Sequence, residues 1–207
     1  MFYELIKYGL NAMGIIPLIY LLLNFKILKN HAPAWLLSIS FILYIYIFIT
    51  SNLSIRNWWV MNLFAMITVF VVALMVNQLA YGKVFRRIGS VLGLLLSSGM
   101  FIAYLFVFDW QYDLKPAILP HIAYTILISL FGFFDLAFHS KKDNLMDESA
   151  FWYYSGLLIF YSVLIFREIQ PLELVQESYA IVQSVIYLLL CISFTIGLYK
   201  WKIQSQS

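Results

Sequence analysis

The fold of this chain is decided by residues 117–139, "AILPHIAYTILISLFGFFDLAFH". The stretch has no Lys or Arg, and its only acid is Asp135, close to the end. A helix needs about 20 apolar residues to cross the hydrocarbon of a bilayer. The stretch therefore predicts a membrane-spanning helix that carries an acid near one membrane surface.

The composition of the whole chain agrees with this prediction. Of the 207 residues, 63% are hydrophobic and 11% are charged, whereas about 25% of the residues in a soluble domain are charged. The formal net charge is only +3, and the basic residues are scattered over short loops, which excludes a nucleic-acid partner. The single cysteine, Cys191, excludes a disulfide and a multi-cysteine metal site.

Six further stretches have the length and apolarity of a membrane span, and none shows the alternation of a membrane barrel. We predict an all-α integral membrane protein, a single domain over residues 1–207 that forms a bundle of seven transmembrane helices. Its location would be the cell membrane, as a multi-pass protein, and the inner membrane in a Gram-negative cell. The predicted spans are residues 8–25, 34–52, 58–80, 88–108, 117–139, 150–167 and 178–199.

The distribution of basic residues predicts the orientation, because Lys and Arg are enriched in cytoplasmic loops. One side of the membrane holds four of them: Lys7, Arg56, Lys115 and Arg167. The other side holds nine, which places the N-terminus outside and the C-terminus in the cytoplasm: Lys26, Lys29, Lys83, Arg86, Arg87, Lys141, Lys142, Lys200 and Lys202.

At 100° per residue, the polar and small residues of segment 117–139 share one helix face. Ionisable residues in spans usually face the bundle interior and mark functional sites. The alternative is structural: the histidines lie in the headgroup zones, Asp135 pairs with Arg86, Arg87 or Lys141, and the hydroxyls bond their own helix. Both interpretations stay open for this face, which comprises His121, Thr125, Ser129, Gly132, Asp135 and His139.

Two other segments carry patterns that favour helix packing. Gly89, Gly93 and Ser97 recur every four residues, a spacing that lets two helices approach closely. Amides such as Gln78 in segment 58–80 favour hydrogen bonds to neighbouring helices over ligand binding.

The last two segments carry hydroxyl and amide groups that either line a cavity or bond across the two helices. With the polar face of 117–139 they complete the expected ligand-binding set: His121, Thr125, Ser129, Asp135, His139, Ser162, Gln183 and Tyr187. The sequence contains no zinc, nucleophile-elbow or phosphate-loop motif. We therefore expect no cofactor and no metal.

Three stretches resemble the YhhN-type lysoplasmalogenase family of small membrane proteins: "LPHIAYTILISL" (119–130), "SAFWYYSGLLIFYSVLIF" (149–166) and "YAIVQSVIYLLL" (179–190). The resemblance implies a related helical fold and hydrolysis of the vinyl-ether bond of lysoplasmalogens. Ser162 is followed by Val163 where the family has an acid. An enzyme of this type would here use Asp135 and His139 as its catalytic residues.

The leading functional hypothesis is a non-catalytic sensor or a module that binds a small molecule or a membrane lipid. A signalling role would need a separate cytoplasmic protein, and its expected docking surface is Lys83, Arg86, Arg87, Lys141 and Lys142. The lysoplasmalogenase-like enzyme is the alternative. A small transporter is the third hypothesis, and it is weaker because Pro17 is the only clear mid-span proline and no inverted repeat is visible.

Overall fold

The computed structural model of the chain describes residues 12, 14–52, 58–106, 115–169 and 176–206. Over these residues the protein is all-helical and has no strand, as predicted. Each element coincides with or lies beside a predicted segment. The elements are α2 (Ile15–Leu23), α3 (Phe25–Leu28), α4 (Ala32–Asn52), α5 (Trp58–Leu79), α6 (Lys83–Phe106), α7 (Lys115–His139), the 3₁₀ turn η1 (Leu145–Asp147), α8 (Ser149–Ile169) and α9 (Gln176–Gln204).

Four helices contain stretches that are long and apolar enough to cross a membrane. They are Asn62–Leu79 in α5, Lys83–Phe106 in α6, Ile118–His139 in α7 and Ser184–Gln204 in α9. Over the described residues, α4 and α8 contribute shorter apolar stretches, Ala32–Leu43 and Ser149–Ile165. These helices are compatible with a membrane protein.

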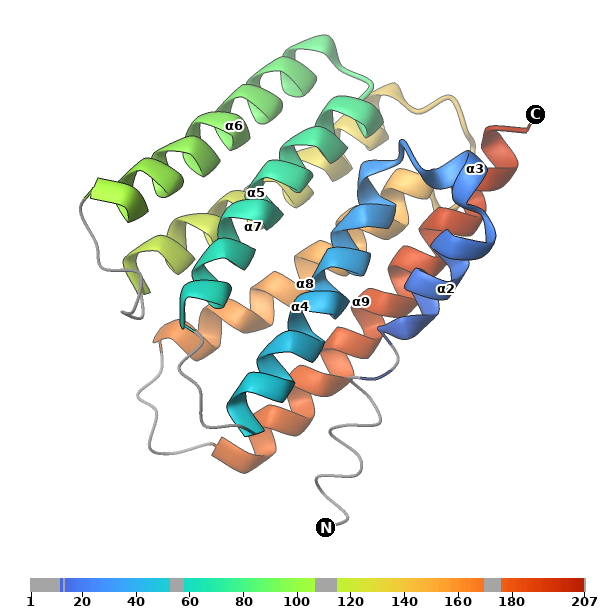
Figure 1. Cartoon of the computed structure of the whole chain (residues 1–207). Coiled ribbons are helices and arrows are strands. Elements are labelled where there is room, and N and C mark those ends of the chain that lie inside the picture. Colours follow the sequence, from blue (N-terminus) through green and yellow to red (C-terminus); the bar gives the residue numbers. More distant parts are fainter. Residues whose placement is uncertain (1–11, 13, 53–57, 107–114, 170–175, 207) are drawn as a thin grey trace.

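The helices lie side by side, and α5 is at the centre of the bundle (Figure 1). The α5 helix packs against α4, α6 and α7, while α8 packs against α7 and α9, and α9 returns to α4 and α2. Val69, Val72, Met75 and Val76 of α5 are completely buried. The core therefore runs along α5.

The outermost helix is α6, which covers α5 and α7 on one side only. Its outer face is apolar and exposed, with Val84 72%, Leu95 65% and Phe106 81% accessible. Soluble proteins rarely expose an apolar surface of this extent. Such a face is compatible with a location in a membrane.

The spacing of small residues in α6 matches close contacts with its neighbours, so the packing interpretation is confirmed. The Tyr124 hydroxyl of α7 donates to the Gly89 carbonyl at 2.9 Å, and Ser97 Oγ donates to the Met66 carbonyl of α5 at 3.0 Å. A Cβ added at Gly93 would overlap Tyr124 and the Cβ of Ala73. Three helices thus meet along this seam.

One end of the bundle collects the connections after α3, α5 and α7 together with the C-terminal end of α9 (Figure 1). Gln78, at the end of α5, holds the start of α4. Its Oε1 accepts the Ala32 N–H at 2.8 Å, and its Nε2 donates to the Asn30 carbonyl at 2.7 Å. The interhelical role predicted for this amide is confirmed.

The first predicted segment, 8–25, differs from the structure at its end. Residues 8–11 and 13 lie outside the described residues, and Asn24 interrupts the helix between α2 and α3. Its side-chain Nδ2 donates to the Tyr20 carbonyl at 2.9 Å. A short polar side chain that bonds the local backbone in this way competes with helix continuation.

Two further predictions were wrong, one about the start of a helix and one about prolines inside helices. The α6 helix begins at Lys83 rather than at 88, because its basic first turn extends the helix beyond the apolar stretch. Pro120 lies inside α7, so Pro17 is not the only mid-helix proline. The reason is that α7 begins at Lys115, a full turn before Pro120, and the proline therefore lies beyond the first turn.

Candidate functional site

Five of the six residues of the predicted polar face of α7 are buried, Gly132 among them, whereas His139 is not. His121 is 4% accessible, Thr125 and Ser129 are fully buried, and Asp135 is 6% accessible, but the His139 side chain is 53% accessible. One residue advances a helix by about 1.5 Å, so Asp135 lies roughly 21 Å along α7 from His121. The face therefore contains two separate polar centres.

The two hydroxyls between these centres are satisfied by their own helix. Thr125 Oγ1 donates to the His121 carbonyl at 2.9 Å, and Ser129 Oγ donates to the Thr125 carbonyl at 2.8 Å. Neither hydroxyl needs a ligand to compensate for its burial.

The first centre joins α7 and α8 around His121. Its Nε2 lies 3.1 Å from the hydroxyl of Tyr161 in α8, and the two rings meet edge to face at 5.0 Å. Within the described residues, His121 Nδ1 has no hydrogen-bond partner. The Tyr161 side chain, one of the hydroxyl groups expected either to line a cavity or to bond across helices, connects His121 to the next helix.

The second centre is the carboxylate of Asp135, which holds the turn between α5 and α6. Its Oδ2 accepts the Tyr81 N–H at 2.7 Å, and its Oδ1 accepts the Gly82 N–H at 2.8 Å. His139 Nδ1 lies 3.2 Å from Oδ1. A Cβ at Gly82 would lie 2.5 Å from Oδ1, so this approach requires glycine.

The arginine partner predicted for Asp135 was wrong. Arg86 donates from Nη2 and Nε to the Ala80 carbonyl at 2.7 and 3.0 Å. The physical reason is that the first amide groups of a helix lack intrahelical partners. A carboxylate beside the start of α6 satisfies such groups, and the arginine can stay closer to water.

A second buried acid, Glu148, was missed because it follows a loop in the sequence. It is 5% accessible, accepts the Ser140 hydroxyl at 3.0 Å, and lies 3.7 Å from Lys142 Nζ. The Tyr81 hydroxyl also hydrogen-bonds it, and burial, reinforced by this carboxylate, raises the pKa of Tyr81 to about 12. Tyr81 thus interacts with both acids, with Asp135 through its backbone N–H and with Glu148 through its side chain.

The loop that carries Glu148 is also fixed to the C-terminal helix. Lys200 Nζ lies 2.7 Å from Asp147 Oδ1, and this hydrogen bond and charge lower the pKa of the Asp147 carboxyl. Gln204 Nε2 donates to the Asp147 carbonyl at 2.9 Å. These contacts join the C-terminal end of α9 to η1.

His31 forms a further buried centre at the same end. It was not predicted, because it lies in a short loop between apolar segments. It is 2% accessible. Its Nε2 lies 2.9 Å from the Tyr153 hydroxyl, and its ring stacks on Trp201 at 4.1 Å. Burial lowers the pKa of His31 to about 3, so the ring is neutral at physiological pH.

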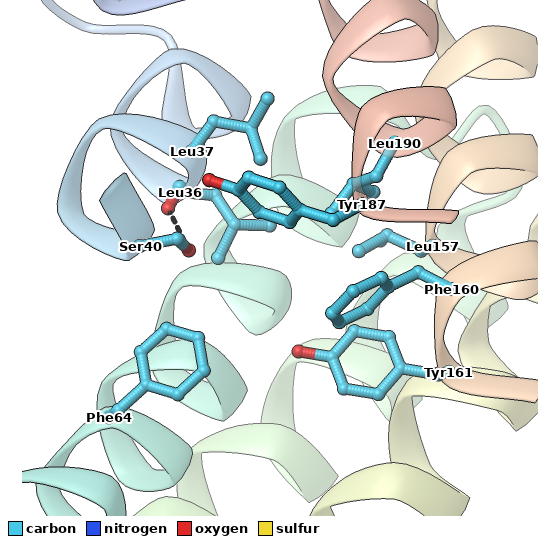
Figure 2. Close-up of a pocket in the computed structure, with 9 residues that line it drawn as sticks. All are labelled: Leu36, Leu37, Ser40, Phe64, Leu157, Phe160, Tyr161, Tyr187 and Leu190. Atoms are coloured by element: carbon cyan, nitrogen blue, oxygen red, sulfur yellow. Dashed lines mark hydrogen bonds between the residues drawn. The ribbon is translucent and has the colours of Figure 1, made fainter. Parts of the chain in front are cut away.

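A small cavity of about 30 Å³ lies between α4, α5, α8 and α9 (Figure 2). Most of its lining is apolar, and the polar groups are Ser40, Tyr161 and Tyr187. The Tyr187 ring extends from α9 toward α4 (Figure 2). Its full lining is Leu36, Leu37, Ser40, Phe64, Leu157, Phe160, Tyr161, Tyr187 and Leu190.

The cavity brings together only part of the expected ligand-binding set. Tyr187 lines it, and His121 reaches it through Tyr161. Ser162 is half-buried beside Tyr161 in the sequence but is not in the lining. The side chain of Gln183 lies outside the described residues. Asp135 and His139 belong to the other centre.

The basic residues of the expected partner surface are not equally available. Arg86 is bonded to Ala80, and Lys142 Nζ donates to the Asp147 carbonyl at 2.9 Å. Lys83, Arg87 and Lys141 are exposed.

No family model, curated protein or solved structure matches this chain.

Proposed function

We propose that the protein crosses the membrane seven times, through α2 and α4 to α9, with its N-terminus outside and its C-terminus in the cytoplasm. The exposed apolar face of α6 supports the membrane location. The collection of the basic connections at one end of the bundle supports the orientation (Figure 1).

We further propose that the protein is a non-catalytic module that binds an apolar molecule or lipid within the bundle. The observation that carries this proposal is the cavity between α4, α5, α8 and α9, with its apolar lining and its two tyrosines. Such a lining, with a few polar groups that fix orientation, is typical of small-molecule sites. A space of about 30 Å³ accepts the end of an apolar chain rather than a whole lipid.

Occupancy of the cavity would reach the rest of the bundle through Tyr161. This side chain lines the cavity and also contacts His121 of α7. The other end of α7 holds the α5–α6 turn through Asp135. A shift of α7 would therefore displace the end of the bundle that carries the basic connections. A cytoplasmic partner bound at that end would sense the change.

Native mass spectrometry of the protein extracted in mild detergent tests the cavity. Leu157 is 1% accessible and lines the cavity, so Leu157→Trp should fill it and remove a bound molecule that the wild type retains. The matched control is Leu95→Trp on the outer face of α6, which should retain that molecule. Thermal denaturation of both variants shows whether they fold.

Retention of the same molecule by a folded Leu157→Trp variant would contradict the proposal. Release of an aldehyde from lysoplasmalogen by the purified wild-type protein would instead favour the enzyme alternative.

A further inference from the structure

The first turn of α6 carries an unusual concentration of positive charge. It contains Lys83, Arg86 and Arg87, and no acid. Cations are unfavourable at a helix N-terminus, because the helix dipole is positive there. Arg86 is engaged by the Ala80 carbonyl. In the part of the chain that the structure describes, no ion pair is found for Lys83 or Arg87.

Lys83 and Arg87 lie one turn apart on the same face of α6. Like charges at this spacing destabilise a helix, so an anion between them would relieve a cost that the protein otherwise carries. The same face continues into exposed apolar side chains, with Val91 47% and Leu94 39% accessible. The basic pair, which we define as Lys83 and Arg87, therefore heads a lipid-facing stripe.

The length of α6 places the basic pair at the membrane surface. A helix of 24 residues is about 36 Å long, compared with about 30 Å of hydrocarbon. The first turn, with Lys83, consequently reaches the level of the headgroups. Arg87 lies one turn further into the membrane, and its long side chain can extend back toward the headgroup phosphate. A soluble protein would approach from above the bundle, whereas this pair points outward with the apolar stripe.

We propose that the basic pair binds the headgroup phosphate of an anionic phospholipid whose chains lie along the outer face of α6. The charge of the pair complements the phosphate, and the apolar residues below it complement the acyl chains. The site uses the proposed membrane location of α6, but it is independent of what fills the cavity.

Electron paramagnetic resonance of spin-labelled lipids tests the site with the full chain in phosphatidylcholine vesicles. The probes are spin-labelled phosphatidylglycerol and spin-labelled phosphatidylcholine. The wild type should associate preferentially with phosphatidylglycerol, and the preference should fall as salt is added. Removing both charges, in Lys83→Gln with Arg87→Gln, should reduce the preference by about fivefold per residue.

The matched control is Lys26→Gln with Lys29→Gln, which removes two exposed charges from the same predicted side of the membrane. It should keep the preference, as should the conservative variant Arg87→Lys. Equal losses in both double variants would show general charge attraction and overturn the site. Equal association of both lipids with the wild type would also overturn it, and would leave the basic pair to a cytoplasmic protein.

Discussion

Asp135 is the acid whose surroundings the structure defines most closely. Each of its carboxylate oxygens accepts a backbone N–H from the turn before α6, and His139 lies beside one of them. The negative charge of Asp135 therefore stabilises the α5–α6 turn. The geometry therefore favours the structural interpretation of this acid over a catalytic one.

Replacing Asp135 by Asn should destabilise the protein without removing a ligand from the cavity. The amide can present only one oxygen to the two N–H groups, and a lost charged hydrogen bond costs about 1–3 kcal/mol. Thermal denaturation in detergent measures the loss, and native mass spectrometry follows the ligand. Asp143→Asn, in the exposed loop after α7, is the control. Wild-type stability combined with a lost ligand would assign Asp135 to a binding site.

The buried His31 predicts a dependence of stability on pH. Its pKa is about 3 in the folded protein, compared with about 6.5 in an unfolded chain. Between these values only the unfolded state binds the proton, so the free energy of unfolding falls as the pH decreases from about 6.5 toward 3. The slope from this group is up to about 1.4 kcal/mol per pH unit.

Melting temperatures in detergent between pH 7 and pH 4 check this dependence. His31→Gln should make the slope shallower than that of the wild type. An unchanged slope in the His31 variant would show that other groups dominate the titration.

Residue types alone revealed which side chains are polar within apolar segments, but they did not reveal their partners. The sequence singled out Asp135, His121 and the hydroxyl of Tyr161. It did not reveal that Tyr161 pairs with His121, or that Asp135 accepts the N–H groups of the α5–α6 turn. Partners from distant segments depend on how the helices pack. Glu148 and His31 were missed for another reason: loops in a sequence look exposed, whereas these two are covered by neighbouring helices.

At the level of helices, α6 shows how small residues set the packing. Gly89 accepts a hydrogen bond from Tyr124, and Gly93 leaves no room for a Cβ. The opposite side of the same helix is exposed and apolar. A single helix thus has one face specified in detail by its neighbours and another that needs only to be apolar.

Gly93→Leu should therefore harm assembly far more than Leu95→Ala. The leucine would overlap Tyr124 and Ala73, and overpacking of this kind costs about 1–3 kcal/mol or more. Leu95 is 65% accessible and loses little when shortened. Thermal stability and monodispersity in detergent measure both effects. Equal stability of the two variants would contradict close packing of α5, α6 and α7 at Gly93.

The helices were the most predictable feature, because an apolar stretch of membrane length has few alternatives to a helix. Their ends were less predictable. Asn24 stops α2 through a local side-chain bond, and the basic turn at Lys83 extends α6. In both cases, polar residues determine the boundary in a way that a count of apolar residues does not detect.

At the scale of the molecule, polar contacts between distant segments gather at one end of the bundle. The end that carries the α3–α4, α5–α6 and α7–α8 connections is tied together by Gln78, Asp135, Glu148 and Lys200. We infer that this end faces the cytoplasm. The all-helical architecture followed from composition, but the neighbours of each helix did not, because lipid and helix interior are equally apolar and leave little pattern in the sequence.

The central claim is that the chain crosses the membrane an odd number of times with this tied end inside. Cysteine labelling in intact cells tests it directly, because the native Cys191 is buried and gives little background. A thiol introduced by Ser205→Cys should be protected from a membrane-impermeant reagent, and one introduced by Glu4→Cys should react. Labelling of Ser205→Cys with protection of Glu4→Cys, or labelling of both, would contradict the account.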